Sequence, residues 1–158
     1  MNAIPRTSFV LAMILAALAL LGSPAGATAP TEASGTIQET ALVPTGFRMA
    51  DGNLFISMSI FGTYSGTYSG DFAQEIELIV HSDGSVNFTG ESVCACTVAG
   101  VGSGTLLWRV TGTGTPTTGA GTYTIVSGTG GLASARGQGT FTAAGGIAAY
   151  SGRQHYEP

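Results

Sequence analysis

The chain has 158 residues, of which only 9% are charged, and its formal net charge is −4. Its five cationic residues are all arginines, so it lacks the clustered cations that nucleic acids and anionic membrane surfaces require of a partner. Apolar residues make up 44% of the chain and glycine contributes 25 residues. A hydrophobic core can therefore form in spite of the low charge.

The first 27 residues have the pattern of a secretory signal peptide. Arg6 lies in the opening segment, residues 9–21 form an unbroken apolar run, and Ala25-Gly-Ala27 fits a cleavage site. A retained membrane anchor is disfavoured, because the run is shorter than the ~20 residues that span a bilayer. Cleavage after Ala27 shortens the chain from 158 to 131 residues and changes the net charge from −4 to −5. We therefore expect one exported domain, periplasmic or secreted, without a stable membrane anchor.

The start of the mature chain is expected to be flexible. Thr28–Gly35 is rich in proline and small residues, which favours a lead without regular structure. The first strand is predicted over Thr36–Val43 and ends at Pro44. Asp51-Gly52-Asn53 is a turn signal. The folded domain is accordingly predicted to span residues 36–158.

Two apolar strands with clear alternation come next, Leu54–Tyr64 and Phe72–His81. Between them Gly62-Thr-Tyr-Ser65 repeats as Gly66-Thr-Tyr-Ser69, which we interpret as a bend at a barrel corner. Ser82-Asp-Gly84 closes a hairpin, because Asp-Gly favours positive φ angles. The second strand has one mostly apolar face and one polar face, and these carry respectively Phe72, Gln74, Ile76, Leu78, Val80 and Ala73, Glu75, Glu77, Ile79, His81.

The remaining strands are short and are separated by glycine-rich turns. They are predicted at Val86–Val98 (with a bulge at Gly90), Thr105–Thr111, Thr122–Val126, Thr140–Thr142 and Ile147–Tyr156. Regular short strands without a long helix indicate an antiparallel barrel or a β-sandwich. The immunoglobulin-like sandwich is the weaker alternative, because Cys94 and Cys96 both precede Trp108 and the Cys…Trp…Cys order is absent. In a closed barrel, the last strand must pair with the first.

The stretch Thr122–Phe141 organises this pattern. It reads as a strand, a glycine hinge, one helical turn over Leu132–Arg136, a second hinge at Gly137 and another strand. Leu132 is predicted to point into the core as a plug. Gly128-Thr-Gly-Gly-Leu-Ala133 also fits a dinucleotide-binding fingerprint, but no long helix and no parallel strand with an acidic residue follow it. We reject that interpretation and predict no cofactor.

The same stretch resembles the signature of a known family. Val126-Ser-Gly-Thr-Gly-Gly-Leu-Ala-Ser-Ala-Arg-Gly-Gln-Gly139 is similar to the "GTG-x-L-x-x-x-R-G-x-G" pattern of the DUF3224 family and to the corresponding turn of dirigent proteins and allene oxide cyclases. The upstream segments Phe61–Gly66, His81–Ser85 and Val101–Leu106 follow in the order expected for that family. The resemblance implies a single antiparallel eight-stranded β-barrel. The matching residues Gly128, Gly130, Leu132, Gly137 and Gly139 are structural, and the resemblance places no catalytic residue in this chain.

Few residues are candidates for chemistry. Glu75, Glu77 and His81 share one strand face, where alternate residues are ~6.6–6.8 Å apart, and such carboxylates could act across a sugar ring. The opposite face is the apolar one, so we expect these three side chains to face solvent. They remain weak candidates, and the sequence assigns no catalytic residue. No pair of histidines or cysteines has zinc-site spacing, so no metal is predicted.

Cys94 and Cys96 are two residues apart in a predicted strand. Export favours oxidation, and an ideal strand places their Cα atoms near the upper limit for a disulfide. A bulge would bring them closer. A strained Cys94–Cys96 bridge, two buried thiols and an intermolecular bond all stay open, and of these we expect the bridge. A homo-oligomer also stays open.

Two classes of function compete. One is a non-enzymatic exported barrel that binds a small apolar ligand or a protein partner, and the other is a barrel enzyme related to the cyclases. Small eight-stranded barrels either fill their interior or hold one small ligand, and glycine-rich strands leave room inside. Because acid–base catalysis needs a titratable group in a cleft, the direction of Glu75, Glu77 and His81 discriminates the two. We favour the binding protein.

Cleavage of the leader is directly testable. Because the A-x-A site ends at Ala27, mass spectrometry of the protein from its native source should find an N-terminus at Thr28 or within about two residues of it. An extracytoplasmic fraction that carries intact Met1 would contradict the prediction.

Overall fold

The computed structural model describes residues 28–158, and the predicted signal peptide lies outside the described residues. This part of the chain folds into eight strands and one short 3-10 helix. The strands are β1 (Thr31–Ala50), β2 (Asn53–Gly66), β3 (Ser69–Val80), β4 (Val86–Val98), β5 (Gly102–Thr115), β6 (Thr118–Gly128), β7 (Ala135–Ala144) and β8 (Ile147–Tyr156), and the helix η1 is Gly130–Leu132. Across residues 28–158, no helix is long and apolar enough to cross a bilayer.

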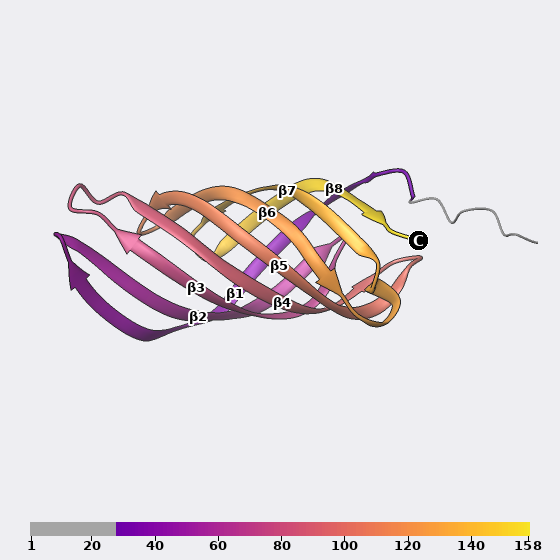
Figure 1. Cartoon of the computed structure of the whole chain (residues 1–158), viewed down its shortest axis with the longest axis horizontal. Coiled ribbons are helices and arrows are strands. Elements are labelled where there is room, and N and C mark those ends of the chain that lie inside the picture. The colour runs from indigo at the N-terminus through magenta and orange to yellow at the C-terminus, as the bar shows by residue number, and fades with distance from the viewer. Residues whose placement is uncertain (1–27) are drawn as a thin grey trace, which may run out of the picture.

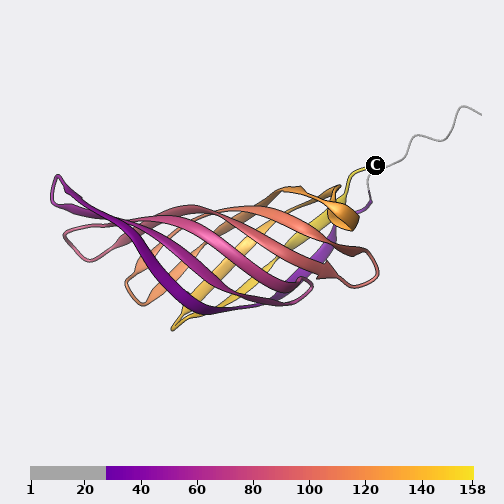
Figure 2. The same cartoon turned by 90° about the horizontal axis from the view of Figure 1, so that it is seen from below.

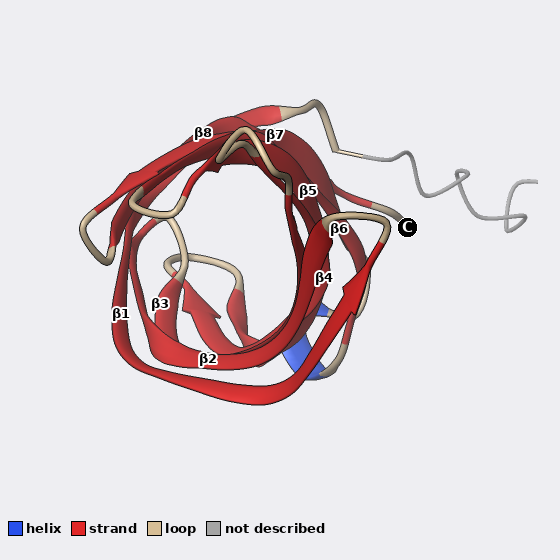
Figure 3. Ribbon diagram, turned by 90° about the vertical axis from the view of Figure 1, so that its left-hand side faces the viewer, coloured by secondary structure: helices blue, strands red, loops and turns tan. Residues whose placement is uncertain are grey.

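All eight strands belong to one antiparallel sheet, in which each strand pairs with its neighbours in sequence. The first strand also pairs with the last, from Thr31 opposite Gln154 to Gln38 opposite Ile147. The sheet therefore closes on itself as a barrel (Figure 1), and the ring of strands is seen end-on in Figure 3. The all-β prediction is confirmed, and the β-sandwich alternative is wrong because there is a single closed sheet.

The two ends of the barrel differ in their turns. At one end, which we call the mouth, lie the tight turns β1–β2, β3–β4, β5–β6 and β7–β8. At the other, which we call the closed end, lie the β2–β3 and β4–β5 turns, η1 and the C-terminus (Figures 1 and 2). The predicted Asp51-Gly52 turn is present, with positive φ at both residues. In the Asp83-Gly84 turn only Gly84 has a positive φ, and the Asp83 carboxylate accepts hydrogen bonds from the amide and hydroxyl of Ser85.

Strand β1 is longer at both ends than the sequence predicted. It begins at Thr31, so the expectation of a flexible lead is wrong for residues 31–35: pairing with β8 orders this segment and buries Ala33. Pro44 does not end the strand. Beyond Gln38, β1 pairs only with β2, and its register shifts between Pro44 and Gly46. A proline is tolerated there because an edge strand with a bulge does not need its missing N–H.

The stretch Thr122–Phe141 also differs in detail from its prediction. The helical turn is η1 at Gly130–Leu132, and β7 already begins at Ala135. Gly137 is therefore a residue of a strand, paired with Ile125 and Gln154, and no helix stop is needed there. Gly130 has φ +59, which suits glycine. Leu132 is fully buried and belongs to the core cluster at the closed end.

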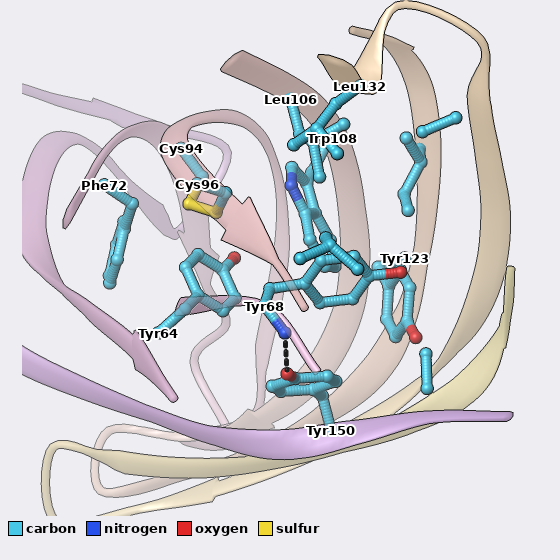
Figure 4. Packing of buried hydrophobic residues seen from close by; sticks show 14 of the residues in the cluster. Tyr64, Tyr68, Phe72, Cys94, Cys96, Leu106, Trp108, Tyr123, Leu132 and Tyr150 are labelled. Atoms are coloured by element: carbon cyan, nitrogen blue, oxygen red, sulfur yellow. Dashed lines mark hydrogen bonds between the residues drawn. A yellow bond between two sulfur atoms is a disulfide. The ribbon is translucent and has the colours of Figure 1, made fainter. Parts of the chain in front are cut away.

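Aromatic side chains around Trp108 fill the closed half of the barrel (Figure 4). The Trp108 ring stacks on Tyr64, with centroids 5.0 Å apart, and meets Tyr68 edge-on at 4.7 Å. Tyr123 and Tyr150 complete the cluster at 4.9 Å and 6.3 Å from Trp108. The Gly-Thr-Tyr-Ser repeat thus supplies two tyrosines to one tryptophan. Burial raises the pKa of both Tyr64 and Tyr68, so these side chains remain neutral.

Glycines give the aromatic rings their space. Five inward rings lie directly across a strand pair from a glycine, in the pairs Phe72 and Gly62, Phe88 and Gly112, Tyr123 and Gly139, Phe141 and Gly121, and Tyr150 and Gly35. A Cβ atom on Gly139 would lie 2.7 Å from the Tyr123 ring, and one on Gly35 would lie 2.5 Å from the Tyr150 hydroxyl. Both Cβ atoms would also collide with a backbone carbonyl oxygen of the neighbouring strand, that of Ser151 and that of Ser65 respectively. These distances are too short for non-bonded atoms. The glycine content therefore allows large rings to fit inside a narrow barrel.

Cys94 and Cys96 face the interior and are bonded to each other. Their Cα atoms are 5.3 Å apart, less than the spacing of an ideal strand. The pairing of β4 with β3 and β5 is unbroken here, so the strand contracts without the bulge that the sequence suggested. Cys96 lies between Gly70 and Gly104 on the two neighbouring strands, and a Cβ atom on either glycine would collide with backbone, that of Ala95 or that of Thr129.

The role of the glycines is tested by one substitution and its matched control. Gly139→Ala should lower the free energy of unfolding by ~1–3 kcal/mol, because the new methyl would overlap the backbone carbonyl oxygen of Ser151 and the Tyr123 ring. Gly119→Ala should change it by less than about 0.5 kcal/mol, since a Cβ there would meet Phe88 at 3.4 Å, an ordinary contact. Urea unfolding measures both. Equal losses in the two variants would refute the argument that close packing requires a glycine at position 139.

The disulfide is tested by counting thiols. Because the two cysteines bond to each other inside one chain, the protein should take up no iodoacetamide in denaturant and two labels after reduction. Mass spectrometry reads the result. Two labels without reductant would mean that the bridge does not form, and a dimer on a non-reducing gel would mean that the bond is intermolecular.

Candidate functional site

The mouth half of the barrel contains a cavity of about 500 Å³. This volume is within the range of small-molecule sites in proteins. Its wall consists mainly of inward apolar side chains, among them Ile37, Met58, Ile76, Leu78, Phe88 and Phe141, and the β5–β6 and β7–β8 turns border it. The cavity is therefore an apolar cup that opens at one end of the barrel.

The aromatic core forms the floor of this cup. Tyr64 and Phe72 line the cavity and also belong to the buried cluster. Their rings pack edge to face, with centroids 5.1 Å apart, and behind Tyr64 lies the stacked ring of Trp108. Large side chains thus fill the closed half, and the interior remains open only toward the mouth.

Small residues keep the part of the cup nearest the mouth open. Gly119, Ala143 and Ala148 face the cavity from β6, β7 and β8. In the closed half, β6 and β8 carry the large inward side chains of Tyr123 and Tyr150. In the mouth half, the same two strands carry only the hydrogen atom of Gly119 and the methyl group of Ala148. The cavity is therefore a direct result of the sequence, because the inward residues of β6 and β8 are small next to the mouth and become bulky further into the barrel, at Tyr123 and Tyr150.

Polar groups in the cup are few. Glu39 is the only charged residue among those that line it, and Gln74 contributes an amide. The hydroxyl groups of Thr115, Thr117 and Thr118 lie in the turn at the rim. Glu39 is half-buried, and burial raises the pKa of its carboxyl group above the ordinary value. A shifted carboxyl in a cleft is a typical feature of functional sites.

The sequence-predicted carboxylates lie elsewhere. Glu75 and Glu77 are exposed on the outer face of β3, and Glu75 accepts a hydrogen bond of 2.7 Å from the Ser59 hydroxyl. The other face of this strand, with Ile76 and Leu78, points into the cavity. Those apolar side chains line the interior without filling it.

His81 lies just beyond β3, half-buried, and takes part in a network of side chains. Its Nδ1 is 3.0 Å from the Asn53 Oδ1, and its Nε2 is 2.9 Å from the Asn87 Nδ2. An imidazole that donates from Nδ1 and accepts at Nε2 satisfies both contacts, so His81 joins β2 to β4. It is not among the residues that line the cavity. Within the described range 28–158, no three His, Cys, Asp or Glu residues could hold a metal ion together.

Sequence reasoning overlooked Glu39. The signal was present, because Glu39 is two residues beyond Ile37 in a predicted strand and therefore shares its inward face. What the sequence did not show is that β1 leaves β8 immediately after Gln38. This separation places the carboxylate beside the β7–β8 turn, where the Glu39 amide donates to the carbonyl oxygen of Gly146.

The family model described as "Protein of unknown function (DUF3224)" matches residues 33–152. The chain belongs to the DUF3224 family. The matched range begins in β1 and ends in β8, so it includes every strand of the barrel. The resemblance of the Val126–Gly139 stretch to this family is thereby confirmed.

A solved structure of the same family has a similar fold. It is a protein of unknown function from Shewanella oneidensis MR-1, with 18% sequence identity and a TM-score of 0.69. The similarity covers 82% of this chain and 99% of that one. At this level of identity the comparison supports the architecture alone. A search of the curated proteins finds no match to this chain.

Proposed function

We propose that this DUF3224 protein is a non-enzymatic exported barrel that binds one small apolar or amphipathic molecule in the cup at its mouth. The cavity of about 500 Å³ is the observation that carries the proposal. Its walls are apolar, its floor is aromatic, and it opens at one end. Apolar surface that leaves water gains ~25 cal/mol per Å², so an apolar guest is favoured in such a cup.

The distribution of side-chain size supports this proposal. A barrel of eight strands can fill its interior completely with side chains, and the closed half of this one does so around Trp108. In the mouth half, Gly119 and Ala148 occupy positions where larger residues would close the space. A protein with a purely structural role has no need of an open apolar interior, whereas a binding protein has.

We further propose a relationship to the barrels of allene oxide cyclases and dirigent proteins. The support is the architecture of eight antiparallel strands in sequential order with closure between β1 and β8, together with the signature turn. The corresponding enzyme alternative has one observation in its favour, the raised pKa of Glu39. No second acid or base with a charged side chain lines the cavity, so binding is the function that the geometry supports best. Export would place that function outside the cytoplasm.

Ligand binding is tested by closing the cup. The neutral fluorescent probe N-phenyl-1-naphthylamine should bind the mature protein with enhanced emission. Ala148→Leu, which adds three carbon atoms to an inward residue of 6% exposure, should weaken binding by roughly tenfold or more. The matched control is Ala149→Leu, one residue further along β8 and exposed. It should bind the probe like the wild type.

Native mass spectrometry of protein from its source gives an independent readout, in which a co-purified small molecule is expected. Melting curves establish that both variants are folded. A wild-type protein that binds no probe and carries no small molecule would contradict the proposal, as would equal effects of the two leucine substitutions.

A further inference from the structure

The carboxylate of Glu39 has an unusual position. It faces the cup, it is half-buried, and it is the one charged group in the lining. The turn beside it consists of Gly145 and Gly146, and a Cβ atom on Gly146 would be 3.9 Å from the Glu39 Oε2. Because two glycines occupy this turn, there is open space next to the carboxylate at the rim of the cup.

No protein group neutralises this carboxylate. Within residues 28–158, neither a salt bridge nor a hydrogen bond reaches its oxygens, whereas Glu91, Glu157 and Glu32 pair with Arg109, Arg136 and Arg153. The fourth arginine of this part of the chain, Arg48, lies over the ring of Phe55 at 4.0 Å. The sequence contains no lysine. Every cationic side chain of the mature chain other than histidine is thus engaged elsewhere.

An unpaired carboxylate in a half-buried place is unfavourable for stability. Desolvation disfavours its charged form, which is the cause of the raised pKa of Glu39. A glutamine at this position would have nearly the same shape and a smaller desolvation penalty. Other carboxylates without a partner, such as Glu77, are exposed on the outside of the barrel, where water solvates them. Glu39 therefore has the features of a group whose partner arrives from outside the chain.

We propose that Glu39 selects the ligand of the cup by its head group, and that this ligand is an amphiphile with a primary ammonium group at the rim and an apolar chain inside. This inference rests on the proposed function. The ammonium donates hydrogen bonds to the carboxylate and neutralises it, and the apolar chain lies against Ile37, Met58 and Phe141. A carboxylate-headed amphiphile of the same length is repelled, because no cation lines the cup.

Head-group selection is tested by competition. Decylamine, decanol and decanoate, each below its micelle concentration at pH 7.5, compete with N-phenyl-1-naphthylamine for the mature protein. Decylamine should displace the probe most effectively and decanoate least. In Glu39→Gln the affinity for decylamine, measured relative to the probe affinity of the same variant, should fall roughly tenfold or more, as expected when a charge-assisted hydrogen bond becomes a neutral one.

Glu77→Gln is the matched control, because it removes the same charge from the outer surface. It should leave decylamine binding as in the wild type, which excludes attraction by the net charge alone. The melting temperature of Glu39→Gln at neutral pH should equal or exceed that of the wild type, since a desolvated charge is removed.

The results separate the two proposals. If the wild type binds neither probe nor amphiphile, ligand binding in the cup is refuted. If the probe binds and Ala148→Leu blocks it, but decanoate competes as well as decylamine or Glu39→Gln keeps full decylamine affinity, only the head-group inference is overturned.

Discussion

The packing of aromatic rings over glycines is the constraint on which this barrel depends. An eight-stranded barrel has an interior just wide enough for side chains, and Trp108 with four tyrosines would overfill it if every inward position carried a Cβ atom. Glycines opposite the rings, such as Gly139 opposite Tyr123, remove that conflict. The closed half can then bury its largest residues at the density of a protein core.

The same constraint explains why the cavity is confined to one end. Toward the mouth, β6 and β8 carry the small residues Gly119 and Ala148. The rings of the neighbouring strands do not completely fill the barrel interior next to them. The aromatic floor and the open cup are thus two results of one pattern. The cavity ends at Tyr64 and Phe72, which also belong to the buried aromatic cluster. The cup has a fixed depth, and its chemistry changes from apolar inside to polar at Glu39 and the threonines of the rim.

Much of this architecture was predictable from the sequence, because strand alternation and turn glycines are local signals. The alternation of Phe72–His81 correctly assigned Ile76 and Leu78 to the interior and Glu75 and Glu77 to the surface. The true extent of β1 was not predictable, since pairing with β8 across more than a hundred residues orders its start and edge bulges allow it to pass Pro44. Glu39 was missed for the same reason. Glu39 becomes distinctive only where β1 separates from β8, which is a property of the closed sheet.

The Cys94–Cys96 bridge joins residues only two positions apart. A crosslink restrains the unfolded chain more as the loop that it closes becomes longer, and a loop of this size contributes less than the ~3 kcal/mol of a fifteen-residue loop. The covalent bond is therefore not what holds the two ends of the sheet together. That closure relies on the ladder between β1 and β8, whose residues are far apart in sequence. Non-covalent pairing therefore closes the barrel, and the disulfide constrains only a short segment within β4.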